Sequence, residues 1–144
     1  GFAGMVLMFQ KEVAQRIRAL PSTENYGMLS VIAQNFWTIT TVCDAGSGDF
    51  SPAPKVSSRV LSFTQKESTI QDRRFFLRLV KQSFYQRRKL LKSNLSSLVH
   101  DLKLPEDFFI QWLSEQKLKE TCRAEELSPL QYAGLYEYFN HSRK

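Results

Sequence analysis

The stretch MVLMFQKEVAQRIRALP, residues 5–21, decides the class of fold because its periodicity changes within a few residues. Met5 to Phe9 is a continuous apolar run of strand length, which is typical of a strand buried on both faces of a sheet. Lys11 to Leu20 then has its apolar residues on one side of a helix, and Pro21 stops that helix. A strand that leads directly into a helix predicts an α/β arrangement.

The elements that follow extend this pattern. Tyr26 to Phe36 is a second helical stretch, and the β-branched run from Trp37 to Cys43 predicts a strand. A loop rich in glycine and proline covers 46–54, after which Val56 to Thr64 predicts another strand. The first half is therefore the β-α-α-β-β tail of an α/β sheet, and it is too short to be a whole one.

The second half carries no strand signal. The polar stretch 65–69 is typical of a linker, and helices are predicted over roughly Thr69 to Val99, Pro105 to Lys119 and Ser128 to His141. In the last helix Ser128 is the expected N-cap and Pro129 the first helical residue. Aromatic and aliphatic residues recur at helical spacing around Trp112 and Tyr136, which predicts core positions.

Charge divides the chain in the same place. The 144 residues carry a formal charge of +6 and a pI near 9.5, which favours a polyanionic partner. Residues 1–65 have five Lys and Arg against four acids, whereas residues 66–144 have fifteen against ten. No apolar run is long enough to span a membrane, and two distant cysteines suggest a reducing, cytoplasmic location.

The basic segment 73–92 is the strongest functional signal from residue type alone. Between Arg73 and His100 there are eight basic residues and no acid. If 73–92 is one helix, its polar residues form a single stripe that consists of Arg74, Arg78, Lys81, Tyr85, Arg88 and Lys92. The alternative is the solvated face of a core helix, but such a face usually mixes signs. The segment therefore favours contact with nucleic acid phosphates.

Two other patterns are weaker. The segment 42–50 resembles the glycine-rich loop of a nucleotide-binding fold, but Phe50 replaces its third glycine and no helix signal follows, so a plain turn is favoured. His100 and His141 have no partners at ligand spacing, so no metal site is predicted. From its residues alone, Phe50 in FSPAPKVSS is either an exposed aromatic on a stiff loop or a plug beneath it.

Five segments in order resemble the small-subunit rRNA adenine dimethyltransferases, the KsgA/RsmA family. They are QKEVAQR (10–16), YGMLSVIAQ (26–34), FSPAPKVSS (50–58), FYQRRK (84–89) and RAEELS (123–128) with Gln131. The resemblance implies the tail of a Rossmann-like methyltransferase domain over 1–65, followed by an all-α C-terminal, rRNA-binding domain over 66–144. The family's cofactor loop and its Asn-Leu-Pro-Tyr motif have no match in this chain.

The resemblance also implies a function. The parent enzyme would use S-adenosylmethionine to dimethylate the exocyclic amines of two adjacent adenines near the 3′ end of small-subunit rRNA, with no metal. Phe50 would stack on the flipped adenine. The residues expected to bind RNA are Lys55, Arg74, Arg78, Lys81, Gln86, Arg87, Arg88, Lys89 and Lys92.

The expected partners are small-subunit rRNA and the pre-30S particle, with the protein a cytoplasmic monomer that does not bind membranes. No residue of this chain is expected to hold the cofactor, so the chain alone is expected to be inactive. Two alternatives stay open. One is a relative with another target, such as the erythromycin-resistance methyltransferases or the mitochondrial transcription-factor-B relatives, and the other is a non-enzymatic basic RNA-binding module.

Overall fold

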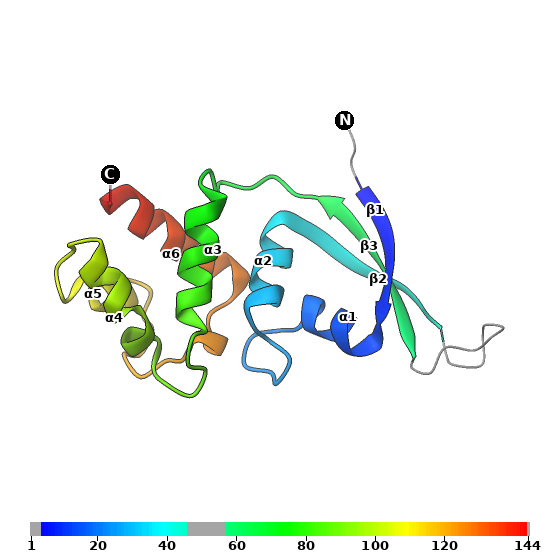
Figure 1. Ribbon diagram of the computed structural model, residues 1–144, viewed down its shortest axis with the longest axis horizontal. Coiled ribbons are helices and arrows are strands. Elements are labelled where there is room, and N and C mark those ends of the chain that lie inside the picture. The colour runs from blue at the N-terminus through cyan, green and yellow to red at the C-terminus, as the bar shows by residue number, and fades with distance from the viewer. Residues whose placement is uncertain (1–3, 46–56, 144) are drawn as a thin grey trace.

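The structure, a computed structural model, describes residues 4–45 and 57–143. A small sheet with two helices forms one end of the molecule, and four further helices form the other (Figure 1). The elements in chain order are β1 (Gly4–Gln10), α1 (Lys11–Arg18), α2 (Met28–Phe36), β2 (Trp37–Ala45), β3 (Ser58–Gln65), α3 (Arg73–Ser83), α4 (Leu91–Asp101), α5 (Phe108–Glu115), the 3₁₀ turn η1 (Ala124–Glu126) and α6 (Pro129–Ser142).

The sheet has the order β1-β3-β2, and both pairings are antiparallel. Gly4 lies opposite Thr64 on β3, while Trp37 lies opposite Gln65, so β3 supplies the hydrogen-bonded neighbour of both other strands. The β1 backbone passes so close to β3 that a Cβ on Gly4 would lie 2.7 Å from the Phe63 carbonyl oxygen. Only glycine fits at that position without a backbone shift.

The described residues cover one face of this sheet and leave the other uncovered. Ala14 and Ile17 of α1 pack against Leu61 and Phe63 of β3 to form a small core. On the opposite face, Val6 and Met8 of β1 are 61% and 54% exposed. The prediction that the run from Met5 to Phe9 is buried on both faces is therefore wrong for this chain.

A larger core fills the helical end, and α2 belongs to it. Tyr26 and Val31, from the first half of the chain, are fully buried together with residues of all four later helices. Phe36 at the end of α2 packs edge to face on Phe76 of α3, with ring centroids 5.9 Å apart. The two halves of the chain thus share one hydrophobic core.

This shared core corrects the predicted fold class. The α/β tail of a Rossmann-like domain followed by a separate all-α C-terminal domain is wrong, because the described residues form a mixed α/β structure built on a three-stranded antiparallel sheet. The sequence pattern predicted helical stretches on both sides of residue 65, but it gave no information on which later helices α2 would contact. The division at residue 65 into a methyltransferase part and an rRNA-binding part stays a prediction.

The predicted start of the last helix is confirmed, but the long helix predicted at the start of the second half is not. Ser128 caps α6 as predicted: its hydroxyl accepts a hydrogen bond from the Gln131 backbone N–H at 3.1 Å, and Pro129 is the first helical residue. The single helix predicted from Thr69 to Val99 is wrong, since α3 ends at Ser83 and α4 begins at Leu91. No helix in the described part of the chain combines the length and apolarity needed to cross a bilayer.

Candidate nucleic-acid interface

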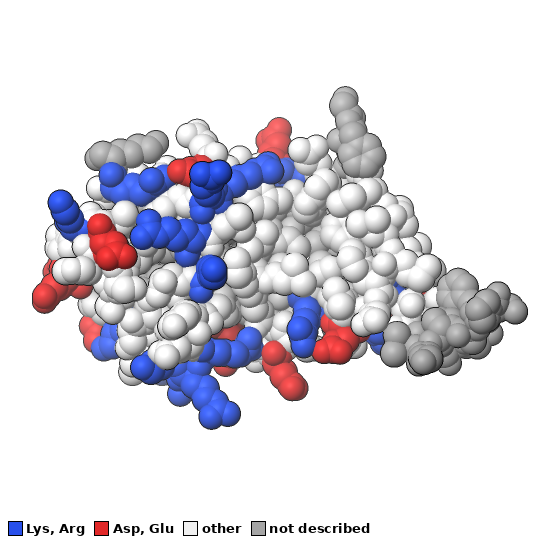
Figure 2. Space-filling model, viewed as in Figure 1, with Lys and Arg blue, Asp and Glu red and all other residues white. Residues whose placement is uncertain are grey.

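Helix α3 exposes its cations and buries its apolar residues except Leu77, which is 40% exposed. Phe76, Leu79 and Val80 are buried, whereas Arg74, Arg78 and Lys81 are exposed. Because residues three and four apart share a helix face, these three cations form one basic side. In the space-filling view, Lys and Arg gather over the helical end, while the sheet end is largely free of charge (Figure 2).

Few acids neutralise this side. Arg78 lies 3.6 Å from Asp101, a pair in which both side chains are more than half exposed. No carboxylate of the described residues lies within ion-pair distance of Arg74 or Lys81. An exposed pair such as Arg78 with Asp101 contributes little free energy, so it would exchange readily for a phosphate.

The chain leaves α3 in a turn, residues 84–90, that carries further polar side chains. Gln86, Arg88 and Lys89 are exposed there, and neither cation has a carboxylate partner among the described residues. Lys92 follows in α4, is only half-exposed and lies 3.7 Å from Glu120. The prediction that these polar residues form one stripe along a single helix is therefore wrong, because they lie on two helices and on the turn between them.

A buried amide sets the shape of this turn. The Asn94 side chain is 4% exposed, and its Nδ2 donates to the carbonyl oxygens of Ser83 and Gln86, both at 3.0 Å. Gln82 Nε2 donates in turn to the Asn94 carbonyl at 2.9 Å. The two bonds from Asn94 satisfy carbonyl groups that a continuing helix would have paired, so they stabilise the end of α3.

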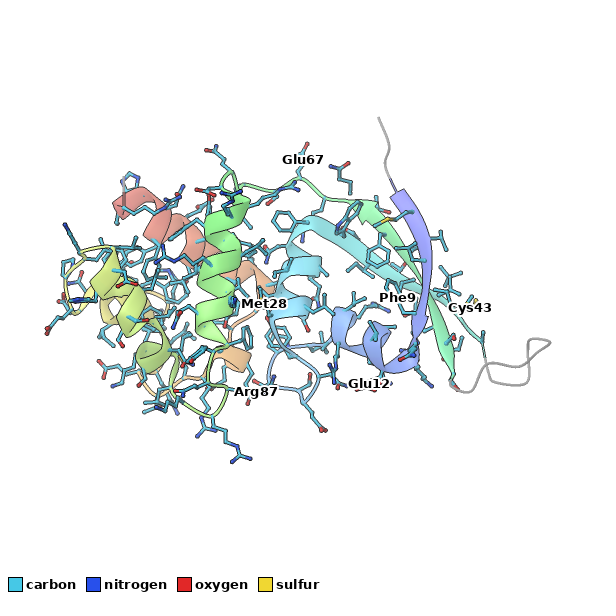
Figure 3. The ribbon with its side chains drawn as sticks, in the orientation of Figure 1. Phe9, Glu12, Met28, Cys43, Glu67 and Arg87 are labelled. Carbon is cyan, nitrogen blue, oxygen red and sulfur yellow. The ribbon has the colours of Figure 1, made fainter. Side chains whose placement is uncertain are left out.

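Arg87 differs from its neighbours because the fold uses its guanidinium. It donates to the backbone carbonyls of Tyr26, Thr23 and Glu24, the last two at 3.1 and 3.3 Å. Its Nη2 also lies 2.8 Å from the Glu125 carboxylate. In the stick view Arg87 lies below α3, facing the loop before α2 (Figure 3). Arg87 is thus a clamp between the turn and the loop 21–27.

Further hydrogen bonds join the loop 21–27 to residues 124–127. The buried Tyr26 hydroxyl donates to the Leu127 carbonyl at 2.6 Å, and burial raises the pKa of Tyr26 well above its ordinary value, which keeps the proton in place. The Ser22 backbone N–H donates to the Glu125 carbonyl at 2.8 Å. We call the contacts among residues 21–27, Arg87 and 124–127 the seam.

The seam brings together three of the five segments that carry the family resemblance. Sequence reasoning assigned Arg87 to RNA and gave no role to Tyr26 or Glu125. The quoted segments did contain all three residues, but spacing along the chain gave no sign that they meet. Two predicted site residues, Phe50 and Lys55, lie outside the described residues, as does the glycine-rich segment 46–50.

Comparison with known proteins gives a consistent answer. The family model for ribosomal RNA adenine dimethylase matches residues 1–141. A ribosomal RNA small subunit methyltransferase A from Bdellovibrio bacteriovorus is 58% identical over 139 residues, which cover 96% of this chain and 51% of the relative. The protein of the same description from Crocosphaera subtropica is 37% identical over 138 residues, 94% of this chain and 49% of its own length.

Two solved structures of methyltransferases have a fold similar to that of this chain. A dimethyladenosine transferase from Plasmodium falciparum superposes with a TM-score of 0.83 at 27% identity, over 97% of this chain and 58% of that one. The 23S rRNA methyltransferase ErmE has a TM-score of 0.67 at 18% identity, over 96% of this chain and 55% of its own, which shows a likeness of fold alone. The chain spans about half the length of the curated relatives it matches. The resemblance is confirmed, and the chain belongs to the ribosomal RNA adenine dimethylase family.

Proposed function

We propose that this chain is part of an S-adenosylmethionine-dependent enzyme that dimethylates two adjacent adenines near the 3′ end of small-subunit rRNA, on the pre-30S particle. Family membership supports the class of reaction. Within the chain, residues 66–144 dock the rRNA, and residues 1–65 contribute to the methyltransferase part. The chain by itself docks RNA and does not methylate it.

The observation that carries this proposal is the basic surface formed by α3 and the turn 84–90. Arg74, Lys81, Arg88 and Lys89 are exposed and have no ion-pair partner among the described residues. Such cations bind phosphates, and the released counterions supply free energy. Their contacts position an RNA without reading its sequence.

Arg87 contributes indirectly. Because it fixes the turn to the loop 21–27, it sets where Arg88 and Lys89 lie relative to the sheet end of the molecule. A docked rRNA would then present its adenines at a defined place. Arg87 is in this proposal a positioning residue rather than a phosphate contact, which revises the role predicted from sequence.

The chemistry needs a target adenine outside its stack. Phe50 is proposed, from the family resemblance, to stack on that base, and Lys55 to contact its backbone. S-adenosylmethionine would supply the methyl groups when bound. We assign no described residue to hold the cofactor and derive no step through it.

The test is RNA binding as a function of salt concentration. The probe is a synthetic hairpin with the sequence of the 3′ end of small-subunit rRNA, and the protein is the chain with Arg88→Ala and Lys89→Ala together. Each lost phosphate contact lowers the log-log salt slope by about 0.7–0.9, so we expect a weaker complex and a slope smaller by about 1.4–1.8.

The matched control removes two charges elsewhere, by Arg18→Ala with Lys66→Ala at the sheet end. It should retain most of the affinity and of the slope. If both double variants lose affinity equally, binding depends on net charge and the surface on α3 has no special role. If neither loses affinity, the proposed docking surface is wrong.

A second test addresses Phe50 in the full-length enzyme. Phe50→Ala should lower adenine methylation by at least tenfold while leaving the melting temperature nearly unchanged, since base stacking contributes about 1–3 kcal/mol per base. Phe50→Trp should retain much of the activity because an aromatic face survives. Loss of activity only in proportion to unfolding would show that Phe50 is a core residue.

A further inference from the structure

Tyr85 stands apart from the other tyrosines of the chain. Tyr26, Tyr132, Tyr136 and Tyr138 each use their hydroxyl in a hydrogen bond to the backbone. Tyr85 is 71% exposed, and no hydrogen bond or aromatic partner for its side chain is found among the described residues. Among the described residues Tyr85 is thus the tyrosine whose ring and hydroxyl are both available to a partner.

The backbone that carries Tyr85 is held on both sides. Phe84 packs between the rings of Tyr26 and Tyr132, with centroids 6.3 and 5.8 Å away. The Asn94 amide holds the carbonyl groups of Ser83 and Gln86, which flank Phe84 and Tyr85. The Tyr85 backbone N–H donates to the Gln82 carbonyl at 3.2 Å. The exposed ring is therefore presented from a fixed turn, so little backbone entropy would be lost when it binds a partner.

The cations that precede and follow Tyr85 in the sequence indicate what kind of partner its ring would bind. Lys81 lies in the last turn of α3, before Tyr85, and Arg88 and Lys89 follow Tyr85 in the turn 84–90. All three are exposed and unpaired among the described residues, and the sequence from 73 to 100 has no acid. An exposed aromatic between cations suits an unpaired nucleobase whose flanking phosphates carry the negative charge.

We propose that Tyr85 stacks on an unpaired base of the docked RNA, while Lys81, Arg88 and Lys89 contact the phosphates beside that base. The inference rests on the proposed function and deepens it, because it assigns the surface to a single-stranded element, a loop or a bulge, rather than to a continuous duplex. Stacking tolerates any base, so the contact selects RNA shape rather than sequence.

The experiment compares the chain with its Tyr85→Ala, Tyr85→Leu and Tyr85→Trp variants. The probes are a single-stranded RNA of about a dozen nucleotides with a central 2-aminopurine, and a blunt duplex of the same length. For the single strand we expect affinity about tenfold weaker with Ala or Leu and near wild type with Trp. Quenching of 2-aminopurine fluorescence should be lost with Ala and Leu. Affinity for the duplex should change by less than about twofold, because its bases are already stacked.

Leu130→Ala is the matched control, since Leu130 is an 81% exposed apolar residue at the start of α6, outside the basic segment. It should bind both probes like the unaltered chain. If Tyr85→Leu binds as tightly as the unaltered chain, the contact is merely apolar and stacking is overturned.

Two results distinguish the loss of the Tyr85 stacking proposal from the loss of the basic surface as an RNA-docking site. If Tyr85→Ala retains affinity and quenching while the Arg88→Ala, Lys89→Ala double variant loses them, the basic surface docks RNA without Tyr85. If both variants bind like the unaltered chain, the surface does not dock RNA and the inference fails with it.

Discussion

The two ends of this molecule bury different shares of their apolar side chains. The helical end holds a continuous core in which Phe76, Leu95 and Tyr132 are fully buried, and each packs within the chain itself. At the sheet end, two residues of α1 and two of β3 form a core of four, and apolar side chains of β1 are exposed to water. Burial is therefore greatest where α2 joins the later helices, while the described residues leave the outer face of β1 uncovered.

The largest expected effect tests this contrast directly. Phe76→Ala removes a buried ring that packs on Phe36 and Tyr136, and should lower the free energy of unfolding by about 3–5 kcal/mol. Val6→Ala, on the exposed face of β1, should lower it by less than about 0.5 kcal/mol. Urea titration of both variants measures the difference. Equal losses would show that the outer face of β1 is also buried in solution.

The next effect concerns the seam that joins the two ends. Arg87→Ala removes hydrogen bonds to three backbone carbonyls and the ion pair with Glu125, and should cost about 1–3 kcal/mol of stability. Arg87→Lys should recover only part of it, because an ammonium lacks the planar fork. The matched control is Arg88→Ala, expected within about 0.5 kcal/mol of the unaltered chain. If Arg88→Ala is the more damaging change, the roles of the two arginines are reversed.

A smaller effect depends on pH. At the start of α3, a hydrogen bond from the Phe75 backbone N–H and then one from Arg143 lower the pKa of Asp72. The carboxylate therefore stabilises the fold above its ordinary pKa of about 4. That contribution is lost as the pH falls through the lower value of the folded state.

Melting temperatures measured between pH 7 and pH 2 test this. Asp72→Asn should melt below the unaltered chain at pH 7, and the gap should narrow as the pH drops. Asp44→Asn is the comparison at the sheet end, where a hydrogen bond from Arg59 lowers the pKa of Asp44 but no helix is capped. Its gap at pH 7 should be the smaller one. A gap for Asp72→Asn that does not depend on pH would show that the charge is not what stabilises α3.

The smallest expected effect comes from two helix ends in the helical half. Lys103 and Lys117 follow α4 and α5 with φ of 57° and 58°, in the left-handed region that favours glycine. Replacing either by Gly should raise the free energy of unfolding by up to about 1 kcal/mol. Lys119→Gly, at an exposed position outside that region, should give no such gain, and a gain there would point to charge rather than backbone strain.

Much of the fold could be predicted from local sequence. Ser128 begins α6 as predicted because a capping hydroxyl acts within a single turn, whereas α1 ends at Arg18, two residues before the end predicted from Pro21. The break between α3 and α4 was missed because the Asn94 amide that stabilises it bonds to carbonyls eight and eleven residues away. The shared core was missed for the same reason, since the contact of Phe36 with Phe76 spans 40 positions.

The candidate site shows the same limit. Residue type identified the acid-free segment, and Arg74, Lys81, Arg88 and Lys89 are indeed exposed. Spacing could not separate Arg87 from Arg88, although one is held by the seam and the other is free of described partners. That distinction depends on the loop 21–27, which lies some sixty residues earlier in the chain.

The position of β3 has a consequence for how this chain folds during synthesis. β1 and β2 are made before β3 and do not pair with each other among the described residues, so neither gains its described partner until residues 58–65 have been made. The β1–β3 pairing closes the longer connection, residues 11–57, so it costs more loop entropy than the β2–β3 pairing, which closes residues 46–57. We therefore expect β2 and β3 to pair before β1 joins them during folding.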